Sequence, residues 1–156
     1  AEEAASLLKA LQQRSKEAPD AYKQPIYVGI YQVGPRSRAL SGKRIEELAH
    51  FPDMTPEEYI AGQMVYPVDL LEKNIPGFAL CEFTIDKEGV ILRPHIVRST
   101  HPEFAEEALR IVKEMPKWTP ALVGGKPADS TYTLYVPFRP QLYKEQVRER
   151  GLSKKD

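Results

Sequence analysis

Two mainly apolar runs, separated by a short polar turn, lie between residues 78 and 97. In the first run, residues 78–85, every second side chain lies on one apolar face, formed by Ala79, Cys81, Phe83 and Ile85. A period of two predicts a strand with one buried side. Residues 86–89 are polar and end in Gly89, which favours a chain reversal, and residues 90–97 form a second apolar run. Because Pro94 has no N–H, we expect a bulge or a sheet edge in this second strand.

After residue 100 the spacing of the apolar residues changes from two to three and four. The residues on this spacing are Phe104, Ala108, Leu109, Ile111, Val112 and Met115. They predict a helix with one face on the core. Thr100-His101-Pro102-Glu103 has the form of a capping box with Pro in the first turn, and Pro116 ends the helix. Residues 78–115 therefore predict a strand, a turn, a strand and an amphipathic helix.

The segment before this unit predicts shorter elements. Residues 26–33 alternate as a strand, which Gly34-Pro35 is expected to end. The basic residues of the loop 36–44 are Arg36, Arg38, Lys43 and Arg44. We interpret them as a solvated loop rather than as a binding site for an acidic partner. Residues 45–50 are expected to form a short helical turn.

Two further helices and a last strand complete the pattern. Thr55-Pro56-Glu57-Glu58 is a second capping box, which predicts a helix through Met64, and Pro67 begins a short helix through Leu71. Trp118 follows the main helix and is expected to cover the core. After a turn at Gly124-Gly125, the β-branched and aromatic residues 131–138 predict the last strand.

These elements divide the chain into three parts. Residues 1–24 are expected to form an amphipathic helix or linker, with a stripe of Ala4, Leu7, Leu8 and Leu11. Residues 25–140 form one domain, in which the strand at 26–33 joins the same sheet as the others. Residues 141–156 form a charged tail, either disordered or a frayed helix around Leu142, Tyr143 and Val147. A first residue other than Met indicates a trimmed chain, so an anchor or export signal is expected outside it.

Charge and composition exclude several partners. The chain has 22 basic and 22 acidic residues. Its net charge of zero gives no global field that would recruit nucleic acid or an anionic membrane. No apolar run reaches the roughly 18 to 20 residues that cross a bilayer. Cys81 is the only cysteine, so no intramolecular disulfide forms, and its strand position predicts a buried thiol rather than a nucleophile.

No catalytic or metal-binding motif is present, so we predict that the protein is not an enzyme and has no cofactor and no metal. The three histidines, His50, His95 and His101, are far apart in the sequence and form no metal-ligand spacing. A Gly-rich phosphate loop and a nucleophile elbow are absent. Glu106 and Glu107 are expected on the solvent side of their helix, and His101 is expected on the surface at a helix start.

Motifs along residues 66–138 resemble the C-terminal domain of TonB energy transducers. In chain order they are Tyr66-Pro67, Gly77-x-x-x-Cys81-x-Phe83-Thr84-Ile85-Asp86-Lys87-Glu88-Gly89, Val97-Arg98-Ser99, the helix from Ala108 with its end Met115-Pro116-Lys117-Trp118-Thr119-Pro120-Ala121, Gly125-Lys126-Pro127, and Tyr132-Thr133-Leu134 to Phe138. Phe51-Pro52 is similar to an FPGG entry of TonB-like proteins of Bacteroidota, although Asp53-Met54 replaces the glycines. The resemblance covers residues 51–140.

The resemblance implies an α+β fold, with one main helix on an antiparallel sheet and the last strand exposed at an edge. It also implies a non-catalytic periplasmic domain that binds the Ton box, the N-terminal segment of outer-membrane TonB-dependent transporters, by strand addition. An inner-membrane proton-driven motor complex supplies the energy, through an anchor expected outside this stretch. The implied partner-binding residues are Tyr66, Pro67, Ser130, Thr131, Tyr132, Thr133, Leu134, Tyr135, Val136, Phe138 and Arg139.

Two departures from the family leave alternatives open. The family often has Pro where Tyr135 stands, whereas here the proline is Pro137, one strand period later, and Pro140 is expected to end the strand. A proline at an edge blocks unwanted pairing, so the strand is either open or guarded. Residues 1–50 match nothing in the family. The alternative function is a stand-alone exported envelope interaction or sensor module that is not coupled to a motor, and an exposed edge is also compatible with a strand-exchanged homodimer.

Overall fold

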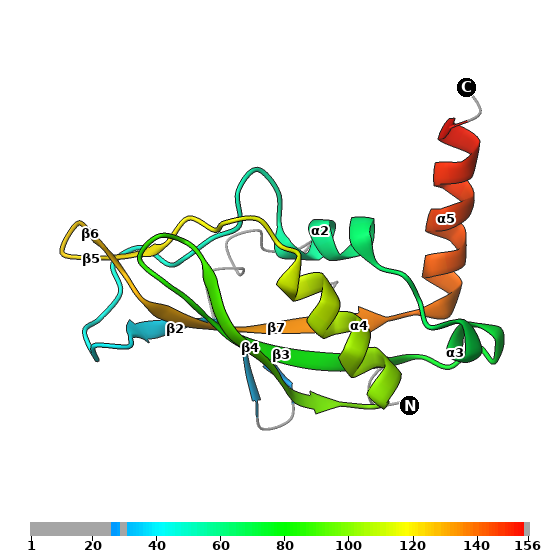
Figure 1. The fold of residues 1–156 in the computed structure, drawn as a ribbon, viewed down its shortest axis with the longest axis horizontal. Coiled ribbons are helices and arrows are strands. Elements are labelled where there is room, and N and C mark those ends of the chain that lie inside the picture. The colour runs from blue at the N-terminus through cyan, green and yellow to red at the C-terminus, as the bar shows by residue number, and fades with distance from the viewer. Residues whose placement is uncertain (1–25, 29–30, 155–156) are drawn as a thin grey trace.

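The computed structural model describes residues 26–28 and 31–154, and the side chains of residues 33–149 (Figure 1). Its helices are α2 (Pro56–Gln63), α3 (Val68–Glu72), α4 (Pro102–Lys113) and α5 (Pro140–Lys154). Its strands are β1 (Ile26–Val28), β2 (Tyr31–Ala39), β3 (Gly77–Ile85), β4 (Ile91–Ser99), β5 (Ala121–Val123), β6 (Lys126–Ala128) and β7 (Ser130–Phe138). The amphipathic helix expected within residues 1–24 lies outside the described residues.

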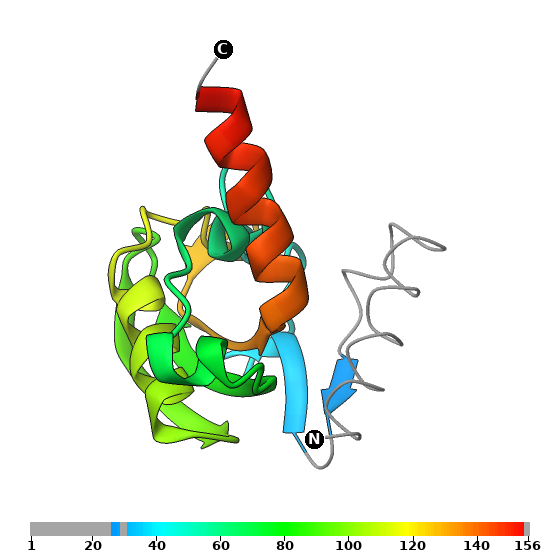
Figure 2. The same ribbon diagram turned by 90° about the vertical axis from the view of Figure 1, so that its right-hand side faces the viewer.

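The sheet has five antiparallel strands in the order β1-β2-β7-β3-β4, and β5 and β6 form a separate hairpin. The predicted α+β fold is therefore confirmed. β3 and β7 pair without interruption over nine positions, from Gly77↔Phe138 to Ile85↔Ser130. α4 crosses one face of the sheet, and β1 and β2 lie on the side away from β4 (Figures 1 and 2). The β3–β7 pair is thus the centre of the domain.

The core lies between this central pair and α4. The predicted apolar face of β3 is confirmed, because Ala79, Cys81, Phe83 and Ile85 are all at most 1% exposed. They pack against every second residue of β7, from Tyr132 to Phe138, and against the buried face of α4. Phe104 of α4 stacks on Phe138, with 4.1 Å between the ring centroids. Burying a large apolar side chain contributes about 1.5 to 3 kcal/mol. Trp118 covers the core as expected, in edge contact with Phe51 and Phe83.

The N-terminal part of the sheet differs from the sequence prediction. The strand does not end at Gly34-Pro35 but continues to Ala39, because Gly34 adopts a φ of 108° that most residues avoid. β2 thereby pairs with β1 through residues 31–33 and with β7 from Gly34 onward. The helical turn expected at residues 45–50 is also wrong. This segment is extended and forms the bridges Glu47↔Leu122 and His50↔Thr119.

Of the two capping boxes predicted from the sequence, the one before α2 is present and the one before α4 is not. Thr55 caps α2 as predicted, since its Oγ1 accepts from the N–H of Glu58 at 3.1 Å. The capping box at Thr100 is wrong, because the N-cap of α4 is His101 and its side chain makes no capping bond. Thr100 is engaged elsewhere. Its Oγ1 accepts from the N–H of Phe78 at 3.0 Å and thereby ties the start of α4 to β3.

The C-terminal segment is a helix rather than a disordered tail. α5 begins directly after β7 and projects from the rest of the domain in both views (Figures 1 and 2). Its first turns contact the body of the domain, where Tyr143 packs on Tyr66 and Lys144 Nζ donates to Asn74 Oδ1 at 2.7 Å. The later turns carry mostly charged residues, so no continuous core-facing stripe marks this helix in the sequence.

Candidate functional site

The strand that the sequence singled out, β7, is not a sheet edge. It is the third of five strands, between β2 and β3, so the expected exposed edge is wrong for its N-terminal half. β2 pairs there through Gly34↔Thr133, Pro35↔Tyr132 and Ala39↔Ser130. We call Ser130–Thr133 the covered half of β7. Sequence reasoning missed this arrangement because the pairing partner of a strand leaves no mark in the strand's own alternation.

The C-terminal half of β7 is different. In the part of the chain that the structure describes, residues 134–138 pair with β3 only. We call this segment the open half. Phe78 of β3 is the partner of Pro137, and the hydrogen bonds of Phe78 show which backbone groups of the open half are free.

Both backbone groups of Phe78 point away from β7. Its N–H donates to Thr100 Oγ1 at 3.0 Å, and its carbonyl oxygen accepts from the N–H of Thr100 at 3.0 Å. Because antiparallel partners alternate between bonded and non-bonded pairs, Phe78 and Pro137 form a non-bonded pair. The backbone of Pro137 therefore faces away from β3, and by the period of two so do those of Tyr135 and Thr133.

This geometry defines what the open half can offer to another strand. Tyr135 presents one N–H and one C=O, and Pro137 presents only a C=O because it lacks an N–H. The next donor toward the N-terminus, the N–H of Thr133, faces β2 and lies opposite Gly34. Pro140 is the first residue of α5 and ends the strand, as expected. The open half is therefore an acceptor-rich strip with a single donor.

The candidate site residues expose little side-chain surface. Seven of the β7 candidates are buried, namely Ser130, Tyr132, Thr133, Leu134, Tyr135, Val136 and Phe138, whereas Thr131 and Arg139 are half-buried. A partner on this strand would consequently meet backbone rather than side chains. Tyr66 is also buried, at 1% exposure, and its ring centroid lies 5.7 Å from that of Phe138. The structure thus places Tyr66 beneath the end of β7, while Pro67 is half-buried beside it.

Tyr66 supports the site from within the core. Its hydroxyl donates to the carbonyl of Ile75, and its ring packs edge-on against Phe104. Burial raises the pKa of Tyr66 above its usual value, so the phenol stays neutral at physiological pH. Tyr66 therefore fixes the α2–α3 connection to the end of β7 and α4.

An ion pair on α4, which was not expected from the sequence, holds the same connection. Glu107 was expected in solvent, but it is buried and accepts from the N–H of Val65 at 2.6 Å. Arg110 donates to both carboxylate oxygens of Glu107, at 2.7 and 2.8 Å, and to the carbonyl of Gln63 at 2.8 Å. The pKa of Arg110 is raised, chiefly by its hydrogen bond to Glu107. The i,i+3 spacing of Glu107 and Arg110 was the available signal.

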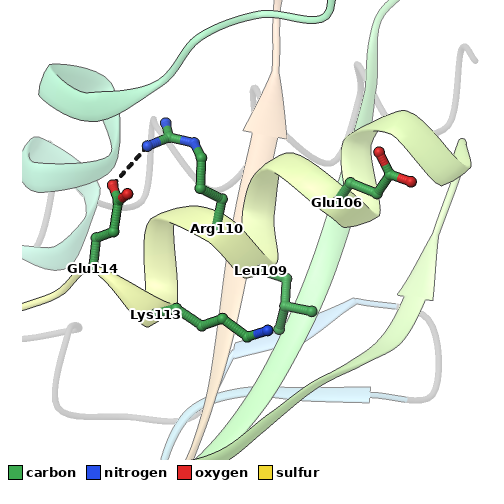
Figure 3. A pocket seen from close by; sticks show the side chains of 5 residues that line it. All are labelled: Glu106, Leu109, Arg110, Lys113 and Glu114. Carbon is green, nitrogen blue, oxygen red and sulfur yellow. Dashed lines mark hydrogen bonds and ion pairs between the residues drawn. The ribbon is translucent and has the colours of Figure 1, made fainter.

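The outer face of α4 carries a shallow, open hollow (Figure 3). It is lined by Glu106, Leu109, Arg110, Lys113 and Glu114, and Arg110 donates to Glu114 within it at 2.7 Å. The opposite charges of these side chains are close together and solvated. The hollow therefore has neither the enclosure nor the isolated acid or base that catalysis requires.

The histidines and the cysteine of the described residues belong to no metal site, since no three His, Cys, Asp or Glu side chains are grouped there. His95 lies beside Glu82, while His101 packs on Phe104 at 5.1 Å and is half-buried rather than fully on the surface. Cys81 is a free, buried thiol, as predicted, and burial raises its pKa to about 12. No helix of the described part is long and apolar enough to cross a membrane.

Comparisons with known proteins agree with the motifs. The family model described as Gram-negative bacterial TonB protein C-terminal matches residues 62–140, about half of the chain. The solution structure of the Pseudomonas aeruginosa TonB C-terminal domain is 25% identical, covers 49% of this chain and 77% of its own, and has a TM-score of 0.41. The TonB2 protein of Vibrio anguillarum is 22% identical, with 73% and 92% coverage and a TM-score of 0.42. No curated protein matches the chain.

Proposed function

The chain belongs to the family of Gram-negative TonB protein C-terminal domains, and from this membership we propose that it is a non-catalytic energy-transducer domain of the periplasm. In this role it binds the Ton box, the N-terminal segment of an outer-membrane TonB-dependent transporter. An inner-membrane proton-driven complex is the proposed source of energy. The Ton box adds as a strand to β7, beside the segment around Pro67.

The observation that carries this proposal is the open half of β7. Strand addition draws its affinity from main-chain hydrogen bonds, and the outward backbone groups of Tyr135 and Pro137 have no strand partner among the described residues. Most side chains of the strand are buried in the domain, so a peptide can pair with the backbone without displacing them. The rigid nine-position register with β3 keeps these groups in place.

The number of free groups limits the affinity of the open half alone. Tyr135 and Pro137 allow about three hydrogen bonds, each with a net value of about 0.5 to 1.5 kcal/mol. The sum stays below the roughly 8 kcal/mol that a micromolar complex requires. A micromolar Ton-box complex therefore needs further contacts, either with the half-buried side chains near Pro67 and Arg139 or with the covered half of β7.

Titration of the isotope-labelled chain with synthetic Ton-box peptides tests this function. We expect amide shifts in the open half of β7 and around residues 65–67, which saturate at micromolar to submillimolar peptide. The control is the same peptide N-methylated at alternate residues. Methylation of the residues that face β7 abolishes binding, whereas methylation shifted by one residue leaves it intact, because only one set of N–H groups can reach β7.

Two results would contradict the proposal. If no peptide causes shifts at millimolar excess, the chain is not a Ton-box receptor, and the uncoupled envelope module becomes the better assignment. If both methylated peptides bind equally, the peptide contacts the domain in some way other than strand addition.

A further inference from the structure

We propose that β2 is a displaceable strand of this chain that competes with the bound peptide for β7. This inference rests on the proposed function, since it concerns the same strand. A peptide that extends beyond Tyr135 needs the outward groups of Thr133 and Thr131, and β2 lies against that part of β7. The competition would make full binding conditional on the release of β2 from the covered half.

β2 is held by little apolar burial. In the stretch 33–39 only Pro35 and Ala39 are buried, and only Ala39 belongs to the main core. β3, by comparison, places four side chains in that core and pairs with β7 over nine positions. Apolar area removed from water is the largest stabilising contribution to such a contact. Release of β2 would therefore expose far less apolar surface than release of β3.

The hydrogen-bonded contact between β2 and β7 is also interrupted. The register shifts between Pro35 and Ala39, so that the pairs Gly34↔Thr133 and Pro35↔Tyr132 are separated from Ala39↔Ser130. In antiparallel pairing, the backbone of Pro35 faces away from β7 when that of Gly34 faces toward it. Few ladder bonds therefore connect the two strands.

One polar contact reaches across β7 and fixes β2 to the next strand. Arg36 Nη2 lies 3.2 Å from Glu82 Oε2 on β3, and the same oxygen accepts from Thr133 Oγ1 at 3.3 Å. The Arg36 side chain is 47% exposed, so water and salt weaken this ion pair. Arg36 and Glu82 thus form an ion pair between β2 and β3 that a single substitution can remove.

The C-terminal end of β2 is anchored more firmly than its middle. The N–H of Leu40 donates to the carbonyl of Asp129 at 3.0 Å, and the N–H of Ala39 donates to the carbonyl of Lys43 at 2.9 Å. Ile45, just beyond, is buried in the core. Release would therefore proceed from Gly34 toward Ala39 and stop at this anchor, which leaves the rest of the domain intact.

Amide hydrogen exchange of the full chain tests the release without any peptide. The N–H of Thr133 faces β2, and that of Leu134 faces β3. We expect Thr133 to exchange at least about tenfold faster than Leu134, because release of β2 needs only local opening. In Arg36→Glu, which replaces the ion pair by repulsion with Glu82, Thr133 should exchange about another fivefold faster while Leu134 is unchanged.

Arg38→Glu is the matched control. Arg38 lies on the same strand and undergoes the same change of charge, but its guanidinium donates only to the nearby carbonyl of Gly42 at 3.1 Å. It should leave the exchange of Thr133 as in the unmodified chain. Titration of the three proteins with the same Ton-box peptide should give about fivefold tighter binding for Arg36→Glu and no change for Arg38→Glu.

The outcomes separate this inference from the proposed function. Equal exchange rates for Thr133 and Leu134 in all three proteins would overturn the inference even if peptides bind, because β2 would then open only with the whole domain. Equal peptide affinities for Arg36→Glu and the unmodified chain would also overturn it. Fast exchange of Thr133 with no peptide binding would refute the proposed function and the competition, while it would leave the opening of β2 established.

Discussion

Replacing Glu107 by Ala tests whether α4 holds the segment that leads into Tyr66. The Glu107 carboxylate is the acceptor for the N–H of Val65 and the main partner of Arg110. The Glu107 side chain is only 10% exposed, but Val65 is 61% exposed, so water can take over part of the lost hydrogen bond. The substitution removes the protein acceptor of the Val65 N–H and one of the two carboxylates that pair with Arg110.

The expected loss follows from these contacts. Loss of the part-buried hydrogen bond to Val65 costs about 1 kcal/mol, the lower end of the range for an unsatisfied N–H, because Val65 is exposed to water. The loss at Arg110 is of similar size, about 1 kcal/mol, because its side chain is 37% exposed and it keeps Glu114 and the carbonyl of Gln63. The free energy of unfolding should thus fall by about 2 kcal/mol, and with a typical urea dependence the midpoint should fall by about 1 M.

Urea unfolding followed by circular dichroism measures this loss, and Glu106→Ala is the matched control. Glu106 is the preceding residue of the same helix and is exposed, so its loss should change the free energy of unfolding by less than about 0.5 kcal/mol. Hydrogen exchange of the Val65 amide should accelerate in Glu107→Ala only. Equal midpoints for the two variants would show that the Glu107 ion pair adds no net stability and would refute the reasoning.

Four further substitutions give distinct expectations. Gly89→Ala should unfold the domain or lower its free energy of unfolding by more than about 3 kcal/mol, as measured in a thermal melt. The Cβ of the new alanine would lie 2.0 Å from the Trp118 carbonyl oxygen. Gly124→Ala, also at positive φ but with nothing within 4 Å, should cost only about 1 kcal/mol. Burial raises the Cys81 pKa from 9.0 to about 12, so the unfolded chain loses this proton first. The free energy of unfolding, which has its full value below pH 9, should therefore be about 1.4 kcal/mol lower at pH 10. Cys81→Ala should remove this part of the pH dependence, and urea titrations at about pH 8 and pH 10 measure it. Pro137→Val restores an outward N–H, so Ton-box affinity measured by calorimetry should rise about two- to tenfold, and an unchanged affinity would mean that this position does not pair.

The sequence predicted the elements whose partners are their own neighbours. The β3–β4 hairpin and α4 follow from local alternation and a short polar turn, and the side chains that alternate in β3 are those that enter the core. The bulge predicted near Pro94 is present, since the register shifts opposite this part of β4 and Arg93 adopts a φ of 52°. Local pattern and tertiary packing agree here, so local reasoning suffices.

The sequence failed where a distant partner decides the structure. Thr100 has the spacing of a capping residue, but Phe78 offers its hydroxyl both a donor and an acceptor across the sheet. Glu107 looks solvated beside Glu106, but the backbone of Val65 approaches it from another segment. Such partners lie 22 and 42 residues away, and no periodicity within one helix or strand encodes them.

Two prolines limit which backbone groups of β7 and β2 are available to a further strand. Pro35 lacks an N–H on the side of β2 that faces away from β7, so β2 can cover Thr133 without losing a ladder bond. Pro137 lacks an N–H on the outward side of β7, so the open half has one donor, at Tyr135, and cannot by itself pair fully with a second strand. The same arrangement disfavours unwanted pairing with another copy of this chain, because an incoming strand gains full pairing only after it displaces β2. Under the proposed function, a Ton-box peptide would therefore have to supply contacts beyond the backbone to displace β2.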